Sequence, residues 1–447
     1  MYLSGADMQR ATGGRWHGAV PEFLPMVSTD TRFFAAGSAF LALRGPNFDG
    51  HNFATSVADD AAALIGDAEG VKQWPDLHHS VLEVTDTLQA FGDIAHAWRL
   101  RLNNTTVIAI SGSYGKTSLR SILETGFSGL GLKVAATHAN LNNLIGVPQT
   151  LLAVPEDADI AIIECGISER GEMSRLAAIV QPDIAVLTGI TEAHSEGLGG
   201  LSGIVREKAL LLDGADWCGL GAGVEALLAE HHIAIPDSTL SLQQTVDWAL
   251  HDCELLLTYQ DQHVSTQLAL PAAHWAANFA FAASIMLRHL ADDATSLQRI
   301  VTAIEAWQPP VGRLQTCAGK NGSVILDDSY NANPVSMQAA IDTLRALRSN
   351  KIAILGDMAE LGKTSLSAHA ELDIKGLDGV YLIGTAMQSL AEQHADAIWF
   401  TDTQAALLAL ANASFTSDDT ILIKASRSMR LDNVVQLLCQ PEVVDAL

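Results

Sequence analysis

The chain has 447 residues, of which 48% are hydrophobic and 17% are charged. Because a domain commonly has about 150 residues, this length predicts two or three domains, and the composition excludes a disordered chain and a coiled coil. The 26 basic and 51 acidic side chains give a net charge of −25, which argues against general affinity for nucleic acid or an anionic membrane.

The first hundred residues predict a small α/β module. The first twenty lack the charged and then apolar pattern of a signal peptide, so we expect a cytoplasmic protein. Strand-like SAFLALRG (38–45) is followed by the segment 53–66 and by a helix near 87–101. Asn103 and Asn104 join this module to the remainder of the chain.

After this module, short β-branched runs alternate with helical periods, which is the signature of βαβ units and a parallel sheet. The candidate strands are 105–111, 133–137, 159–164 and 183–188. A second series follows the linker Gln308-Pro309-Pro310, with strands at 323–328, 351–355, 379–384, 397–400 and 420–425 and helices at 334–348 and 402–413. We therefore predict an α/β fold with three domains, at 1–102, 103–308 and 309–447, the last of them Rossmann-like.

One apolar stretch, 271–287, looks membrane-like. It is shorter than the roughly 20 residues of a membrane span and carries His274 and Asn278 on one helical face, so we expect a buried helix and no membrane insertion. Five scattered cysteines without a CxxC pair predict reduced core residues rather than disulfides or a zinc site.

A glycine-rich loop separates the strand 105–111 from a helix. It consists of Gly112, Ser113, Tyr114, Gly115, Lys116, Thr117 and Ser118. Such a loop directs backbone N–H groups and a helix N-terminus at phosphates, while Lys116 adds a cation and Thr117 a hydroxyl for Mg²⁺. Ile110 stands where a full P-loop has glycine, and an ordinary strand-to-helix turn is the alternative. The context favours a P-loop-type ATPase domain.

Further candidates follow other strands of the same domain. Glu164 ends the strand 159–164 and predicts a metal ligand near the loop, although an N-cap or a solvated turn residue is the alternative. For His194 and Lys208, a surface histidine and a snorkelling lysine are the simpler interpretations.

The last domain contains two acid-bearing loops after strands, DDSYNANP (327–334) and GDMAELG (356–362). The adjacent carboxylates of the first could cap the following helix or accept hydrogen bonds from a ribose. Two such loops at one sheet edge indicate a ligand crevice.

These motifs occur with others in a characteristic order. Asp30-Thr31-Arg32, FLALRGPNFDGHNF (40–53), GSYGKTS, the Asn140–Asn143 run with IGVP, EAHSEGLG (192–199), REKALLL (206–212), the two acidic loops and KASRSM (424–429) follow one another. In this order the chain resembles the Mur ligases of peptidoglycan synthesis over nearly its whole length. It is most similar to the MurF type, which joins D-alanyl-D-alanine to UDP-N-acetylmuramoyl-tripeptide.

The resemblance implies a role for each matching position. In the ATP site, Lys116 contacts the γ-phosphate, Arg313 the phosphates, Asn278 the adenine and Asp328 the ribose. Two Mg²⁺ ions are implied, one held by Thr117 and Glu164, the other by His194 and a carbamylated Lys208. The implied catalytic residues are Lys116, His194, Lys208 and Arg313. Thr31, Arg32 and Asn47 belong to the UDP-sugar site, and the remaining substrate residues are Asn142, Asn331, Asp357 and Arg427.

The implied reaction proceeds through an acyl phosphate, which an amine attacks to expel phosphate. In this scheme domain 1–102 binds the UDP-sugar, 103–308 binds ATP and 309–447 binds the dipeptide. The expected partners are small molecules, without nucleic acid, and a monomer is expected. Whether the third residue of the peptide is diaminopimelate or lysine is set by a pocket that the sequence does not reveal.

Five positions depart from the family pattern, namely Tyr114, Ala272, Ala273, Trp275 and Ala425. They leave room for a paralogue that forms an amide on a different carboxylate. A folylpolyglutamate-synthetase-like enzyme would leave the N-terminal module unexplained. A catalytically weakened nucleotide-binding paralogue would have no physical need to retain Lys116, Glu164, His194, Lys208 and Asp328 together.

Overall fold

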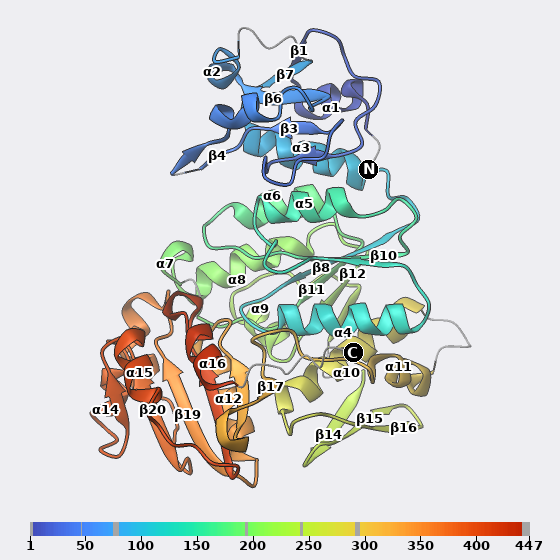
Figure 1. The fold of residues 1–447 in the computed structure, drawn as a ribbon. Helices are drawn as coiled ribbons and strands as arrows, with labels where there is room; N and C mark the ends of the chain where they lie inside the picture. The colour runs from blue at the N-terminus through green and yellow to red at the C-terminus, as the bar shows by residue number, and fades with distance from the viewer. Residues whose placement is uncertain are drawn as a thin grey trace, which may run out of the picture.

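The computed structural model describes residues 3–45, 47–74, 80–192, 195–241, 245–290 and 296–439. Three α/β units follow one another along the chain, so the predicted α/β fold is confirmed (Figure 1). The residues at which we divide the domains, 102/103 and 308/309, stay predictions.

The N-terminal unit is built on a five-stranded sheet in the order β1-β7-β6-β3-β2, in which only β1 is antiparallel to its neighbour. The segment 38–45 contains two short strands rather than one, and 53–66 begins in a 3₁₀-helix and becomes a strand only at Ala63. The elements are α1 (Gly5–Thr12), β1 (Arg15–His17), β2 (Val27–Ser28), β3 (Ala39–Leu41), β4 (Arg44–Gly45), β5 (Phe48–Asp49), η1 (Gly50–Ser56), β6 (Ala63–Asp67), α2 (Ala68–Val71), β7 (Val81–Val84) and α3 (Thr87–Arg99).

The central unit contains a six-stranded parallel sheet in the order β13-β12-β11-β8-β10-β9. All four predicted strands are present, each within two residues of its expected ends. The elements are β8 (Thr106–Ser111), α4 (Lys116–Gly129), β9 (Val134–Ala136), α5 (Gly146–Ala153), β10 (Ile160–Glu164), α6 (Glu172–Val180), β11 (Ile184–Leu187), α7 (Ser195–Leu198), α8 (Leu201–Ala209), η2 (Leu210–Leu212), β12 (Trp217–Leu220), α9 (Val224–Glu230) and β13 (Thr239–Ser241).

Two layers of helix cover this sheet, because its strands are apolar on both faces. Ile108 and Ile110 pack into the core shared with α4 and α10, while Val107 and Ala109 pack into the opposite core, shared with α5, α6 and α8. Helices α5 and α6 separate the central sheet from the N-terminal unit (Figure 1). Trp98 of α3 donates its indole N–H to the carbonyl of Val154 across that boundary, at 3.1 Å.

A three-stranded antiparallel sheet, which the sequence analysis did not predict, completes the central unit. Its strands are β14 (Asp247–His251), β15 (Glu254–Tyr259) and β16 (Gln262–Gln267), followed by α10 (Ala273–Leu290) and α11 (Leu297–Ile304). Helix α10 contains most of the apolar stretch 271–287 and is buried along nearly its whole length, as predicted. Among the helices in the described ranges, none has the length and apolar character needed to cross a membrane.

The C-terminal unit has a six-stranded sheet in the order β17-β18-β22-β19-β20-β21, parallel except for β17. The predicted strands and both predicted helices are present, although the helices end three residues earlier than expected. The elements are β17 (Gln315–Ala318), η4 (Lys320–Gly322), β18 (Val324–Asp328), α12 (Pro334–Arg345), β19 (Asn350–Gly356), η5 (Gly362–Thr364), α13 (Ser365–Ala370), β20 (Gly379–Ile383), α14 (Gln388–Ala391), β21 (Ile398–Phe400), α15 (Thr403–Leu410), β22 (Asp419–Lys424), η6 (Arg427–Met429) and α16 (Asp432–Leu438).

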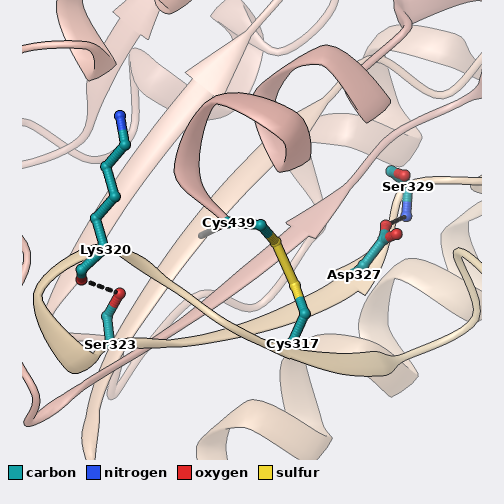
Figure 2. Close-up of a disulfide and its surroundings, with 6 residues drawn as sticks. All are labelled: Cys317, Lys320, Ser323, Asp327, Ser329 and Cys439. Carbon is teal, nitrogen blue, oxygen red and sulfur yellow. Dashed lines mark hydrogen bonds between the residues drawn. A yellow bond between two sulfur atoms is a disulfide. The ribbon is translucent and has the colours of Figure 1, made fainter. Parts of the chain in front are cut away.

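Two of the five cysteines form a disulfide, which corrects the prediction that all five are reduced. Cys317 on β17 is bonded to Cys439 at the end of α16, with their Cα atoms 6.5 Å apart (Figure 2). The residues are 122 positions apart in sequence, so their spacing could not reveal the pairing. Cys165 and Cys218 are buried free thiols, as expected.

The ends of β11 and β12 touch so closely that only glycine fits at position 221. A Cβ atom there would lie 1.7 Å from the carbonyl oxygen of Thr188. At Gly219, on the adjoining strand β12, the nearest atoms would be 3.5 Å away. We expect Gly221→Ala to lower the free energy of unfolding by about 2–3 kcal/mol, because the backbone of β11 must move. Urea denaturation measures the change. Gly219→Ala is the matched control and should stay within about 1 kcal/mol of wild type; equal losses in the two variants would contradict the argument.

Candidate functional site

A cavity of about 610 Å³ lies where the carboxyl ends of the central strands face the C-terminal unit. It brings together side chains from both units, as expected for the crevice beside a parallel sheet. The predicted site residues that line it are Ser113, Gly115, Lys116, Thr117, Ser118, Asn142, Glu164, Lys208, Asn278, Arg313, Asp328, Asn331 and Arg427.

The phosphate loop owes its shape to two glycines with positive φ, Gly112 (151°) and Gly115 (83°). A Cβ atom at Gly112 would lie 2.1 Å from the hydroxyl of Thr188. Helix α4 begins at Lys116, and among the described residues no side chain caps its first N–H groups. These donors therefore face the cavity as an anion-binding site, as the sequence predicts.

Two lysines donate to the same backbone oxygen in this loop. The Nζ atom of Lys116 lies 2.6 Å from the carbonyl oxygen of Gly112, and that of Lys208 lies 3.2 Å from it. Burial lowers the pKa of Lys116 to about 8, an effect that the Glu164 carboxylate opposes and the Arg313 guanidinium reinforces. Lys208 is 1% exposed, and burial, together with the Lys116 ammonium, holds its pKa well below the ordinary value.

Glu164 occupies the end of β10, where the sequence places it. Its side chain is 1% exposed and accepts hydrogen bonds from the Arg120 guanidinium at 2.8 Å and the Thr117 hydroxyl at 3.2 Å. The hydroxyl of Thr137 accepts from its backbone N–H at 2.8 Å. The carboxylate is thus held beside the phosphate loop with its charge balanced by Arg120.

The C-terminal unit contributes a buried ion pair. Asp328 and Lys424 are register partners at the ends of the neighbouring parallel strands β18 and β22, and their charged atoms lie 2.7 Å apart. Lys424 also donates to the carbonyl of Asn331 at 2.8 Å. The Arg313 guanidinium lies over the ring of Tyr330, 4.3 Å from its centroid, and reaches the same cavity.

Helix α10 supplies the cavity wall on a third side. His274, Trp275 and Asn278 all line it. Burial, and secondarily the Lys424 ammonium, lowers the pKa of His274 to about 4, so the imidazole is neutral at physiological pH. Contact between the two units also includes a hydrogen bond from the Asn333 amide to the carbonyl of Ser113, at 3.4 Å.

Some predicted residues lie away from this cavity. Thr31, Arg32 and Asn47 belong to the N-terminal unit, where the exposed Arg32 forms an ion pair with Asp30 at 2.7 Å. Asp357 accepts hydrogen bonds from the backbone N–H groups of residues 386 and 387, and these bonds fix its carboxylate within the C-terminal unit. His194 lies outside the described residues.

The donor set fits a divalent cation only in part. The described residues contain no group of three or more His, Cys, Asp or Glu side chains arranged around one point. Glu164 and Thr117 offer two adjacent oxygen donors, which suit Mg²⁺ when phosphate oxygens supply others. Lys208 could take part only as an anionic derivative, because an amine is a poor Mg²⁺ ligand.

The sequence analysis missed several residues that shape the site. Arg120 lies one helical turn after Lys116. Lys424 is the last residue of β22 and the first residue of KASRSM. Both positions are visible in the sequence, but their carboxylate partners are far away along the chain and become evident only in the fold. Tyr330, which supports Arg313, lies within the acidic loop and was not singled out.

Comparisons with known proteins cover all three units. The models "Mur ligase family, catalytic domain", "Mur ligase middle domain" and "Mur ligase, glutamate ligase domain" match residues 24–99, 110–224 and 312–427. The UDP-N-acetylmuramoyl-tripeptide–D-alanyl-D-alanine ligase of Escherichia coli is 30% identical over 93% of this chain and 94% of its own length. That of Bacillus subtilis is 31% identical over 93% of each.

Solved structures give the same result. MurF from Acinetobacter baumannii superposes with a TM-score of 0.86, at 27% identity over 98% of both chains. MurF ligase from Thermotoga maritima in complex with ADP has a TM-score of 0.78, at 25% identity over 92% of this chain and 96% of the other.

The lowered pKa of Lys116 makes stability depend on pH. Between pH 8 and 10.5 the unfolded chain holds a proton on this side chain that the folded chain has released, so stability rises with pH in that window. We expect the rise to be smaller in Lys116→Met, which keeps the length of the side chain and removes the ionisable group. Urea denaturation at about pH 7.5 and about pH 10 measures the difference. An equal rise in the free energy of unfolding of the two proteins would contradict the lowered pKa of Lys116.

Proposed function

The chain belongs to the Mur ligase family, and from this premise we propose that it is an ATP-dependent ligase joining D-alanyl-D-alanine to UDP-N-acetylmuramoyl-tripeptide. The observation that carries the proposal is similarity over 93% of the chain and 94% of a relative with that name. The enzyme acts on small molecules and contributes to peptidoglycan precursor synthesis. An acyl phosphate intermediate accounts for the use of ATP, because a carboxylate is a poor acyl donor.

We assign the three domains to three ligands. Residues 1–102 hold the UDP-sugar through Thr31, Arg32 and Asn47, residues 103–308 hold ATP, and residues 309–447 hold the dipeptide. The three matched family segments fall within these limits and support the division. Since the cavity combines the central and C-terminal units of one chain, a monomer is sufficient, and we place it in the cytoplasm.

In the ATP site, the unpartnered N–H groups of α4 and the ammonium of Lys116 bind phosphate oxygens, with Arg313 on the opposite wall. Asp328 accepts from the ribose while Lys424 fixes its orientation, and Asn278 faces the adenine. Thr117 and Glu164 would hold one Mg²⁺, which neutralises charge during phosphoryl transfer. A second ion would be held by His194 and a modified Lys208.

The transfer itself needs little from the protein except positioning and charge. The substrate carboxylate forms a bond to the γ-phosphorus as the bond to ADP breaks. The amine of the dipeptide then attacks the acyl carbon, loses a proton, and expels phosphate from the tetrahedral intermediate. Asn142, Asn331 and Arg427 line the same cavity and would orient the two reactants; Asp357 stays a more distant candidate. The C-terminal unit covers the cavity and excludes water from the acyl phosphate.

We further propose that Lys208 is carbamylated. A buried amine with a strongly lowered pKa is neutral and therefore nucleophilic. Its nitrogen lone pair attacks the carbon of CO₂, one C=O electron pair moves to oxygen, and the amine proton leaves to solvent. The product is an anion, so the modified Lys208 would no longer repel the Lys116 ammonium beside the Gly112 carbonyl. The anion would also supply a metal ligand.

The departures from the family pattern are unequal in weight. Ala425 is fully buried, and its methyl group occupies space beside Gly356, which has no side chain. Ala425 therefore affects packing in the C-terminal core and does not line the cavity. Tyr114 and Trp275 line the cavity itself, and Ala272 and Ala273 precede the latter on the chain. These positions favour the alternative candidate, a Mur-ligase-like enzyme that forms an amide on a different carboxylate.

The test of the proposed function is ADP release by the purified protein with ATP, Mg²⁺, UDP-N-acetylmuramoyl-tripeptide and D-alanyl-D-alanine, each omitted in turn. We expect release to require every component and mass spectrometry to find a UDP-muramoyl-pentapeptide. Supplying the tripeptide with diaminopimelate or with lysine identifies the preferred third residue. Bound ATP without release in any mixture would move the proposal to the alternative substrate.

Lys208→Ala tests the carbamate. We expect activity to fall by about a hundredfold or more, because a charged group at the reacting phosphate is removed. Bicarbonate should not restore it, whereas a short-chain carboxylic acid that fits the space should restore part of it. Lys133→Ala is the matched control, since this lysine is exposed, forms an ion pair with Asp157 and does not line the cavity. Activity near wild type in Lys208→Ala would remove the proposed role.

A further inference from the structure

A buried hydroxyl without a hydrogen bond lies at the end of β8. Ser111 is 0% exposed, and its Oγ atom has no partner among the residues that the structure describes. Buried polar side chains are nearly always hydrogen-bonded, so each exception asks for an explanation. Its neighbour in sequence, Gly112, is the residue whose carbonyl accepts from both lysines.

Ser111 and Lys208 lie on the same face of the central sheet. Side chains alternate along a strand, so Ser111 shares the face of Val107 and Ala109, whose core includes residues of α8. Lys208 belongs to α8, and its Nζ atom is 3.2 Å from the oxygen of Gly112, the next residue after Ser111. The unpaired hydroxyl therefore belongs to the residue next to the one whose carbonyl the buried amine contacts, on the same face of the sheet.

The Ser111 hydroxyl and the Lys208 amine do not satisfy each other's hydrogen-bonding capacity. In the described part of the chain, no carboxylate forms an ion pair with Lys208, and its one acceptor is shared with Lys116. The hydroxyl can donate or accept, yet among the described residues no hydrogen bond joins it to the Lys208 amine. Cys165, which packs in the same core, is a fully buried thiol and a weak acceptor. An acceptor that carries negative charge and is attached to the lysine would satisfy the hydroxyl.

We propose that the Ser111 hydroxyl donates a hydrogen bond to an oxygen of the Lys208 carbamate and holds it in position. This inference rests on the proposed carbamylation. Ser111 is a positioning residue, since it acts through Lys208 and touches neither nucleotide nor substrate. Because carbamate formation is reversible, the bond stabilises the adduct and increases its occupancy at a given concentration of CO₂.

The test measures occupancy rather than activity. Wild type and Ser111→Ala are equilibrated with ¹³C-labelled bicarbonate, and the carbamate signal is followed by ¹³C NMR. A hydrogen bond to a charged group contributes about 1.5–3 kcal/mol, so Ser111→Ala should need roughly 10-fold more bicarbonate, or more, for half occupancy. Ser111→Thr keeps a hydroxyl and should restore most of the affinity, whereas Ser111→Cys, which keeps the size but is a weak donor, should not.

Thr266→Val is the matched control. Thr266 on β16 also has a buried hydroxyl without a partner among the described residues, but it lies outside the cavity. Without CO₂, both Ser111→Ala and Thr266→Val should keep or raise the melting temperature, because each removes an unpaired buried hydroxyl. With bicarbonate, only Ser111→Ala should lose the carbamate signal.

The outcomes separate this inference from the function on which it rests. Equal half-occupancy in wild type and Ser111→Ala would overturn the role of Ser111 while leaving the carbamate in place. A wild-type protein that forms pentapeptide but shows no carbamate signal would overturn both the carbamate and Ser111, and would leave the ligase function standing. A lower melting temperature of Ser111→Ala without CO₂ would show that the hydroxyl has another partner, and this also overturns the inference.

Discussion

The constraint on which the site depends is the crowding of two lysine side chains around one carbonyl oxygen, that of Gly112. The Glu164 carboxylate acts on Lys116, but it is already paired with the Arg120 guanidinium. The chain as a whole carries a charge of −25. Against this overall negative charge, Lys116, Lys208 and Arg120 lie together at the carboxyl ends of the central strands. The N-terminus of helix α4 adds N–H donors at the same place. A polyphosphate supplies the missing negative charge, and in its absence burial and repulsion from neighbouring cations hold the pKa values of both lysines below their ordinary value.

The C-terminal unit meets this site with a charge arrangement of its own. Asp328 and Lys424 end neighbouring parallel strands in register, so the sheet itself holds the ion pair at one height. Arg313, shortly before β17, lies over Tyr330, and the carbonyl of Gly312 accepts the N–H of that tyrosine at 3.3 Å. The three polar groups are thus fixed to the C-terminal sheet rather than to the phosphate loop.

Sequence patterns predicted those parts of the molecule that depend on neighbours along the chain. Most strands of both six-stranded sheets, and the phosphate loop with Lys116 and Thr117, follow from local periodicity and turn chemistry, whereas β12, β13 and β17 were not predicted. The pairing of Arg120 with Glu164, or of Cys317 with Cys439, depends on which strands become adjacent, and nothing in the local sequence specifies that. The antiparallel strands β14–β16 escaped prediction because many of their side chains are exposed or half-buried, so that few apolar positions mark the strands in the sequence.

The attachment of Arg313 to Tyr330 has a consequence for the assembly of the site. The guanidinium travels with the C-terminal sheet, while the loop that binds phosphate belongs to the central one. Were the two units to lie apart, a nucleotide on the central loop would keep Lys116 and lack the arginine. The full set of cations around the phosphates is therefore assembled only where the two units meet, which ties the charge available for phosphoryl transfer to their contact.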